Sequence, residues 1–450
     1  MRKVQNFKNS NKFRSKIHNL IPGGAHTYSK GDDQFPLIAP AAIDFGKGSK
    51  LWDLDGNKFL DCGMGLSSVS LGHAYKPVVN EVKKELLKGS NFQRPSIIEL
   101  KMAEEFLKLV PQHDMIKFAK NGSTATTAAV KLARAKTGRQ LIALPSEHPF
   151  YSYDDWFIGT TKCGFGVPKE IKNLSVKFKE CNIESVKELF SKYPNQIACV
   201  ITEPQRSFCN TSCKCNRPVK SFLKELIEVS HKNGALVIFD EMITGFKVDF
   251  PGVMTKYSLD PDMATWGKGI ANGFSFSALT GKKSVMQLGG IKNREGKEKV
   301  FLVSTTHGAE THSLSAAIAT IKIFKKKKVI QHNQKMGSLL IKKCQKIVDQ
   351  LKINKHVEIV KSSWMVIFNF YDNEGKASLS HKTLIMQEMI KNGVLFQGVF
   401  IPCYSHSKKD VDFFVKAFNK SLRIYIKSLK KGVGAYLLGR PIKPVFRKII

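Results

Sequence analysis

Short, mainly apolar runs recur through the middle of the chain, and each is followed by a polar residue of chemical interest. The runs are Met115–Ala119, Leu141–Leu144, Ile197–Thr202, Ala235–Phe239 and Met263–Trp266, and the polar residues after them are Ser123, His148, Glu203, Asp240 and Lys268. Such a run, when bounded by Gly or polar residues, is typical of a strand buried on both faces of a parallel sheet. Ligands of open α/β sheets bind where the carboxyl ends of the strands meet. The series therefore predicts an α/β fold with one cleft along that edge.

Two of these residues suggest a specific chemistry. Asp240 follows the run Ala235–Phe239, and Lys268 stands between Gly267 and Gly269, which permit a tight turn and a close approach. A lysine amine can form a Schiff base with pyridoxal 5′-phosphate (PLP), and a carboxylate can pair with the pyridinium nitrogen of that cofactor. A strand that ends in an acidic residue is also common without any such role, so the pair alone leaves both interpretations open.

A phosphate site is indicated after the first run. Gly122-Ser123-Thr124 leads into a small-residue segment, Ala125–Ala135, which we expect to be helical. The free amides and the positive dipole end of a helix N-terminus bind anions, and the two hydroxyls add donors. An ordinary helix cap would use the same residue types.

An aromatic cluster follows the second run and spans His148–Phe157. His148, Phe150 or Tyr151 could stack on a flat cofactor ring. The alternative is a small apolar cluster under a loop, which is the more common arrangement.

A metal site is not predicted. Cys209, Cys213 and Cys215 are close together and His231 could add a fourth ligand, but no C-x-x-C pair accompanies them. His307 and His312 are five residues apart, and we expect both histidines to form hydrogen bonds.

Composition limits the class of protein. The 450 residues exceed a single core, so two domains are expected. No apolar run has the length of a membrane span, and no signal-peptide h-region is visible near Met1. Nine cysteines in a chain of this length fit reduced thiols. We therefore expect a cytoplasmic protein that does not bind membranes.

The net charge of +35 raises the question of nucleic-acid binding. The lysines are spread over the whole chain, and short runs such as Lys325–Lys328 are not interleaved with aromatic residues. This distribution favours a solvated, lysine-rich surface, and we do not expect a nucleic-acid partner.

The flanking segments give local predictions. Leu51–Asp61 predicts a β-hairpin with its turn at Asp55-Gly56. Apolar residues recur at the helical period between residues 75 and 110. Beyond about residue 325 the pattern is that of alternating helices and strands.

Taken together, the motifs resemble those of the class III, fold-type I PLP-dependent aminotransferases, and most closely the branch that contains glutamate-1-semialdehyde 2,1-aminomutase. The resemblance covers roughly residues 20–325 and, more loosely, the C-terminal part. The residues that carry it are Pro22-Gly23-Gly24, Leu51–Gly56, Leu71-Gly72-His73, Asn121-Gly122-Ser123, Leu132-Ala133-Arg134, Glu203-Pro204, Phe239-Asp240-Glu241, Thr244-Gly245-Phe246, Pro261-Asp262 and Gly267-Lys268.

This resemblance implies a large PLP-binding domain over residues 66–324, with a mainly parallel sheet of the seven-stranded type. It also implies a small α/β domain built from residues 1–65 and 325–450. Lys268 and Asp240 would be the catalytic residues. The remaining cofactor-binding residues would be Gly122, Ser123, Thr124, His148, Phe150, Glu203 and Thr306. Thr306 would reach a phosphate across a homodimer interface.

The sequence departs from the family at three places. Glu147-His148-Pro149 stands where the family has Tyr-His-Gly at the ring-stacking loop, and Thr124 stands where an acidic residue is common. The third departure is near the N-terminus, where Lys30 lies near a position usually held by Arg. Lys30, His26 and Arg206 are candidates for contacting a substrate carboxylate.

The resemblance implies an aminotransferase that moves an amino group between an amino donor and a carbonyl acceptor through a Lys268 Schiff base. The alternative is intramolecular amino transfer of the aminomutase type. A third hypothesis, from another class, is a basic nucleic-acid-binding protein on a former enzyme scaffold.

Overall fold

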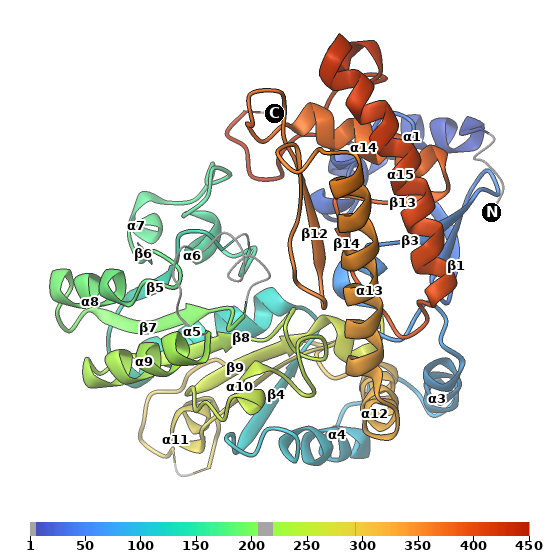
Figure 1. The fold of residues 1–450 in the computed structure, drawn as a ribbon. Helices are drawn as coiled ribbons and strands as arrows, with labels where there is room; N and C mark the ends of the chain where they lie inside the picture. Colours follow the sequence, from blue (N-terminus) through green and yellow to red (C-terminus); the bar gives the residue numbers. More distant parts are fainter. Residues whose placement is uncertain (1–5, 149, 206–218, 293, 450) are drawn as a thin grey trace. The chain divides into compact units, whose positions relative to one another are not determined.

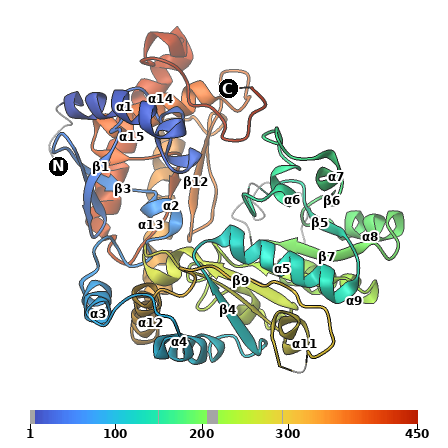
Figure 2. The same ribbon diagram turned by 180° about the vertical axis from the view of Figure 1, so that it is seen from behind.

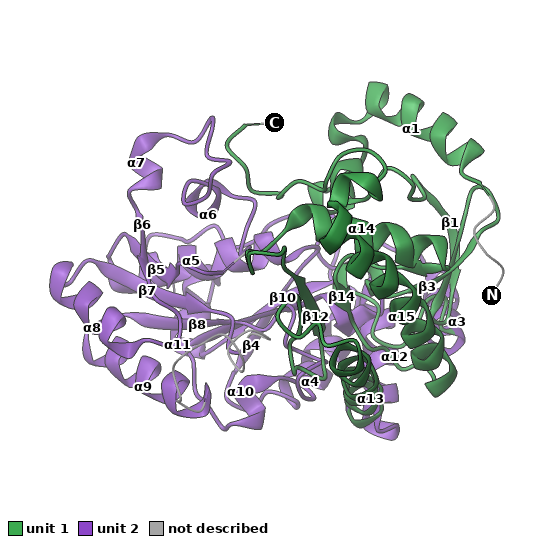
Figure 3. Ribbon diagram, turned by 45° about the horizontal axis from the view of Figure 1, so that its top comes forward, with its two compact units in different colours: residues 1–75, 331–450 green, residues 76–330 purple. Residues whose placement is uncertain are grey.

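The structure is a computed structural model that describes residues 6–148, 150–205, 219–292 and 294–449. The chain forms two compact units, one of residues 76–330 and the other of residues 1–75 with 331–450 (Figure 3). No helix in the described ranges is both long and apolar enough to cross a membrane.

The unit of residues 76–330 is built on a seven-stranded sheet of order β4-β10-β9-β8-β7-β5-β6. The strands are β4 (Met115–Ala119), β5 (Leu141–Pro145), β6 (Ser175–Phe178), β7 (Ile197–Thr202), β8 (Leu236–Asp240), β9 (Met263–Gly267) and β10 (Ser277–Gly281). β6, β5, β7, β8 and β9 pair in parallel, whereas β10 is antiparallel to both β9 and β4. β4 therefore points the same way as β9, and the predicted mainly parallel sheet is confirmed.

The strand residues explain their central position, because every residue of β5, β7, β9 and β10 is buried. A run of this kind has no solvent face and needs helices on both sides. Helix α5 packs on β9, β10 and β7 and crosses one face of the sheet (Figure 2). The helices of this unit are α3 (Lys76–Leu86), α4 (Ile97–Leu107), α5 (Gly122–Thr137), α6 (Asp155–Ile158), α7 (Lys169–Lys172), α8 (Ile183–Lys192), α9 (Val219–Lys232), α10 (Val253–Lys256), α11 (Lys283–Met286) and α12 (Thr311–Lys326), with the 3-10 turns η4 (Lys268–Ala271) and η5 (Gln287–Gly289) (Figure 1).

The second unit has two small sheets. One has the order β1-β2-β3-β13 and the other the order β11-β12-β14. Their strands are β1 (Ile43–Lys47), β2 (Lys50–Asp53), β3 (Lys58–Asp61), β11 (Val357–Ile359), β12 (Val366–Phe370), β13 (Val394–Leu395) and β14 (Val399–Phe400). Because β13 pairs with β3, both ends of the chain contribute to one sheet. The hairpin predicted over residues 51–61 is confirmed as β2 and β3.

Helices complete this unit: α1 (Lys8–Leu20), α2 (Met64–Ser67), α13 (Val329–Gln350), α14 (Leu379–Lys391) and α15 (Lys408–Lys431), with the 3-10 turns η1 (Pro22–Gly24), η2 (Tyr28–Lys30), η3 (Asp32–Gln34) and η6 (Val433–Ala435). One apolar cluster joins Leu60 to the inner faces of α13, α14 and α15, with Phe368, Phe396 and Phe414 at its centre. Helices α13, α14 and α15 and the two-ended sheet therefore share one core.

Candidate active site

The predicted site residues that end strands lie at the carboxyl edge of the seven-stranded sheet. Asp240 is the last residue of β8, and Lys268 follows the last residue of the neighbouring strand β9. Glu203 follows β7, and His148 lies three residues after the end of β5. Because these strands are parallel, their ends bring the four side chains to one edge.

Asp240 is buried and held by two donors. The Thr265 hydroxyl donates to its Oδ1 at 2.9 Å, and the amide of Met242 donates to the same oxygen at 3.0 Å. Oδ2 accepts no hydrogen bond from the residues that the structure describes. Burial raises the pKa of Asp240, whereas the nearby His148 lowers it. The arrangement leaves one carboxylate oxygen available to a further donor.

Lys268 has an unusual backbone conformation and a desolvated amine. Its φ is +46°, in the left-handed region that non-glycine residues rarely adopt. Desolvation lowers the pKa of its amine, while Asp240 and Glu203 act in the opposite direction. A lysine of lowered pKa can act as a nucleophile or as a base.

His148 forms a buried network with its neighbours. Its Nε2 lies 3.0 Å from Glu203 Oε2, and its ring stacks on Tyr151 with 3.7 Å between the ring centres. The amide of Phe150 donates to His148 Nδ1 at 3.2 Å, which places the ring proton of a neutral His148 on Nε2, toward Glu203. The Tyr151 hydroxyl accepts from the Glu203 amide at 3.2 Å.

The predicted phosphate-binding segment forms the first turn of α5. Asn121 caps the helix and accepts from the Thr124 amide at 3.0 Å, so the amides of Gly122 and Ser123 are left for another acceptor. Ser123 Oγ accepts from the Tyr153 amide at 3.0 Å. A side chain at Gly122 would come within 3.0 Å of Met242, so glycine preserves this packing beside the Asp240 turn.

Two predicted residues have exposed positions. Phe150 joins the His148 network through its backbone amide, but its side chain is directed to the edge of Phe157 and the residue is 45% exposed. Thr306 lies in an exposed loop, where its carbonyl accepts from Asn91 Nδ2 at 3.1 Å.

The cysteine cluster and Arg206 lie outside the described residues. No group of three His, Cys, Asp or Glu side chains within the described ranges could hold a metal ion. His231 instead pairs with Asp262 at 2.8 Å, and His307 contacts Glu310 at 3.1 Å.

Two site residues were not predicted from the sequence. Thr265 interrupts an apolar strand, and a buried hydroxyl needs a partner, so its presence in that strand was an available signal. Lys247 is buried in the turn after β8, and the hint in the sequence was a lysine within the mainly apolar stretch Met242–Val248.

Comparison with known proteins agrees with this geometry. Residues 28–422 match the family model described as aminotransferase class-III. The chain belongs to the class III aminotransferase family.

Individual relatives extend this result. A glutamate-1-semialdehyde 2,1-aminomutase of Archaeoglobus fulgidus is 31% identical over 437 residues, which are 92% of this chain and 99% of that protein. Among solved structures, the PLP internal aldimine form of the FumI protein of a Sphingopyxis species has a TM-score of 0.84 at 21% identity, over 96% of this chain and 98% of that one. A glutamate-1-semialdehyde aminomutase of Pseudomonas aeruginosa has a TM-score of 0.78 at 16% identity, over 93% and 94% of the two chains. The structural matches establish the fold-type I architecture.

Class III aminotransferases depend on PLP, and the residues present fit this cofactor. Asp240 has an oxygen available for a ring N–H, the first turn of α5 has amides available for a phosphate, and Lys268 supplies an amine on the same sheet edge. The donor set therefore matches a flat, phosphorylated aldehyde with a basic ring nitrogen.

Proposed function

We propose that this enzyme moves an amino group between an amino donor and a carbonyl acceptor, with Lys268 and Asp240 as its catalytic residues. The observation that carries the proposal is the pairing of neighbouring strand ends, a buried Asp240 with one available oxygen after β8 and a Lys268 of lowered pKa after β9. PLP, when bound, supplies an aldehyde that takes up the amino group and a ring that withdraws electrons from the substrate Cα.

The other steps of the reaction would depend on residues of the chain itself. Asp240 would hold a proton on the ring nitrogen, since a carboxylate fixed by Thr265 and Met242 is a strong acceptor. Lys268 would take a proton from the substrate Cα and return it. Gly122, Ser123 and Thr124 would hold the phosphate, and His148 with Glu203 would line the ring side of the site.

The ring-stacking residue is part of this proposal. His148 is already stacked on Tyr151 and tied to Glu203, so it is fixed in place. We propose that the ring of His148 stacks on the cofactor ring and that Phe150 covers the outer edge of the site.

We further propose that residues 66–324 form the PLP-binding domain and that residues 1–65 and 325–450 form the small domain. The compact units of residues 76–330 and of 1–75 with 331–450 support boundaries close to these.

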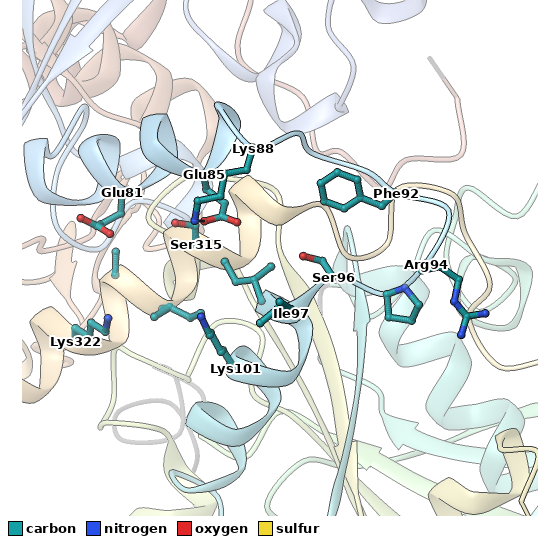
Figure 4. A pocket seen from close by; sticks show the side chains of 14 residues that line it. Glu81, Glu85, Lys88, Phe92, Arg94, Ser96, Ile97, Lys101, Ser315 and Lys322 are labelled. Atoms are coloured by element: carbon teal, nitrogen blue, oxygen red, sulfur yellow. Dashed lines mark hydrogen bonds and ion pairs between the residues drawn. The ribbon is translucent and has the colours of Figure 1, made fainter.

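A homodimer is also proposed, and its support is a surface on α3, α4 and the segment between them. Large apolar side chains are exposed there, including Leu87 at 90%, Ile97 at 75% and Leu100 at 62%. Ile97 also lines a groove of about 610 Å³, together with Phe92, Ser315 and Lys322, among others (Figure 4). Exposed apolar surface of this kind marks an interface.

Thr306 lies beside the same surface. Its carbonyl is bonded to Asn91, and Thr311 Oγ1 donates to the carbonyl of Gly89 at 2.8 Å. A second copy packed on this surface would therefore have Thr306 within its reach. Replacement of Leu87 and Ile97 by glutamate should shift the protein from dimer to monomer in sedimentation velocity. A wild type that sediments as a monomer at all concentrations would contradict the homodimer.

The aminomutase reaction is the second candidate, because relatives that cover most of the chain carry that name. Net conversion of a single amino compound without an added carbonyl acceptor would favour it over transamination.

A cytoplasmic location is proposed on the basis of buried free thiols such as those of Cys62 and Cys344.

The deciding experiment is visible absorbance of the purified protein with added PLP, before and after borohydride. We expect a yellow protein that borohydride bleaches and labels at Lys268, and a Lys268→Ala variant that cannot be labelled. Lys256→Ala, which changes an exposed lysine of α10, is the matched control and should behave as wild type. A wild type that takes up no PLP would overturn the proposal.

A further inference from the structure

One face of helix α5 contacts the part of the chain that carries the aromatic cluster. Three hydroxyl residues project from this face because they stand at positions i, i+3 and i+4 of the helix: Ser123, Thr126 and Thr127. Ser123 Oγ accepts from the Tyr153 amide at 3.0 Å, and Thr126 Oγ1 lies 3.0 Å from the carbonyl oxygen of Tyr151. The aromatic segment (residues 150–157) is therefore hydrogen-bonded to the helix whose first turn is the proposed phosphate site.

Thr127 joins two further side chains of the aromatic segment. Its hydroxyl donates to Asp154 Oδ2 and accepts from Trp156 Nε1 at 2.8 Å. Ser152 Oγ lies 3.2 Å from Thr127 Oγ1 and 3.3 Å from Asp154 Oδ2, so it adds a contact to the same group. Hydrogen bonds to a carboxylate are stronger than those between neutral groups. The contact between α5 and the aromatic segment is therefore centred on Thr127.

The carboxylate of Asp154 is directed to α5 although Asp154 begins another helix. It occupies the N-cap position of α6, where an aspartate commonly accepts from the amides of the first turn. Within the described residues its side chain makes no such hydrogen bond. Because the carboxylate binds Thr127 in place of its own helix, we interpret Asp154 as a contact between elements.

Trp156 connects Thr127 to the ring side of the proposed site. Its ring packs against the edge of Phe157, with 6.0 Å between the ring centres, and Phe157 packs against Tyr151 at 5.7 Å. Tyr151 in turn stacks on His148. Protein interiors are close-packed, so a shift of one ring in such a series displaces the next. The position of His148 relative to α5 therefore depends on Thr127.

The two ends of the proposed cofactor site depend on these two parts of the chain. The amides of Gly122 and Ser123 in α5 would hold the phosphate, and His148 would stack on the ring. PLP joins its ring to its phosphate through one methylene group and one ester oxygen, so the spacing of the two anchoring points is short and nearly fixed. A ligand held at two points binds most tightly when the protein holds both points in place before binding.

We propose that Thr127 is a positioning residue, which through Asp154 and Trp156 fixes the aromatic segment on α5 and so sets the distance between the ring and phosphate ends of the PLP site. Thr127 acts through these neighbours and need not touch the cofactor. This inference rests on the proposed function, because it concerns how PLP would be held.

The test measures two constants with the apoenzyme of wild type and of Thr127→Val: the Kd for PLP and the inhibition constant of inorganic phosphate against PLP uptake. Valine keeps the shape of the side chain but removes the hydroxyl. The Kd for PLP should rise roughly tenfold, which is the scale of one hydrogen bond to a charged group. The constant for inorganic phosphate should change less than about twofold, because phosphate alone needs only the helix terminus.

Matched variants separate this role from a general loss of stability. Thr127→Ser retains the hydroxyl and should restore the wild-type Kd for PLP. Thr137→Val removes a hydroxyl from the other end of α5, where it donates to the carbonyl of Ala133 at 2.8 Å, and should leave both constants unchanged. Trp156→Phe removes the indole N–H and should also raise the Kd for PLP, which keeps the inference testable if Thr127→Val does not fold.

A second readout is the visible circular dichroism of the protein saturated with PLP, which reports how the ring is held. The band should weaken in Thr127→Val and recover in Thr127→Ser. Folded variants with the wild-type Kd and band would overturn the inference, and so would an equal loss of affinity for PLP and for inorganic phosphate. A wild type that takes up no PLP would contradict the proposed function itself and, with it, this inference.

Discussion

The carboxylate of Asp240 carries the first prediction at the scale of single residues. Asp240→Asn should retain PLP yet lower kcat/KM by roughly a hundredfold or more, because an amide cannot hold a proton on the ring nitrogen. Steady-state kinetics beside the visible spectrum will measure this. Asp260→Asn, at an exposed aspartate that pairs with Lys282, should keep wild-type kinetics. If kcat/KM of Asp240→Asn is within threefold of the wild-type value, Asp240 is not a catalytic residue.

Thr265 gives a second prediction, since its hydroxyl is one of the two donors to Asp240 Oδ1. Thr265→Val keeps the shape of the side chain but removes that donor, which should cost about 1 kcal/mol of unfolding free energy. It should also reduce kcat/KM. Thr265→Ser retains the hydroxyl and should recover most of both losses. Urea unfolding and steady-state kinetics will measure the stability and kcat/KM of the two variants. Equal values for Thr265→Val and Thr265→Ser would exclude a role for the hydrogen bond.

Helix α5 carries a prediction at the scale of elements, because its first turn is both a cap and the proposed phosphate site. Asn121→Ala should cost about 0.5–2 kcal/mol of unfolding free energy and should weaken PLP binding roughly tenfold. Asn182 caps α8 in the same way, by accepting from the Ser185 amide. Asn182→Ala should therefore lose similar stability without a change in the Kd for PLP. Equal Kd values for the two variants would argue against a phosphate at α5.

The elements also show how far the sequence could be interpreted. The five mainly apolar runs are strands β4, β5, β7, β8 and β9. Burial on both faces explains this composition for β5, β7, β8 and β9, whereas in the edge strand β4 only Ala119 is buried. β6 and β10 were not predicted. β10 reads Ser-Ala-Leu-Thr-Gly, and it tolerates two buried hydroxyls because Ser277 donates to the carbonyl of Trp266 and Thr280 interacts with His113 and Trp266. Those partners come from other elements of the chain, so no local pattern reveals them.

The candidate site, too, could be predicted from the sequence only in part. Residues that end strands could be placed by counting along the chain, and Asp240, Lys268, Glu203 and His148 do share one edge. The hydrogen bond of Thr265 and the burial of Lys247 depend on how one strand or turn packs against another. Tertiary packing of this kind is not encoded in spacing.

A prediction for the whole molecule concerns its stability as pH changes. Burial raises the pKa of Glu241 to about 7, although Thr244 and the amides of Met254 and Val253 act to lower it. The pKa of Glu241 is higher in the folded protein than in the unfolded chain. Its contribution to the free energy of unfolding is therefore complete below about pH 4.5 and is lost as pH rises toward and through 7. The free energy of unfolding lost in this way is roughly 3 kcal/mol at most.

Glu241→Gln cannot ionise and should therefore gain stability relative to wild type between pH 5 and pH 8. Chemical unfolding of both proteins at these two values will measure the difference. Glu188→Gln, at an exposed position of α8, serves as the control and should follow wild type. Parallel stability curves for wild type and Glu241→Gln would show that Glu241 is not protonated in the fold.

The antiparallel strand β10 has a consequence for the order in which the protein can assemble on the ribosome. β4 stands at the edge of the sheet, and its one partner strand within the described residues is β10, which is made after all the other strands of that sheet. Until residue 281 has emerged, the strand that leads into α5 has no neighbour to hold it, and sequence-distant pairing of this kind is slow. We therefore expect the first turn of α5, the proposed phosphate site, to form only after the turns bearing Asp240 and Lys268 have been synthesised.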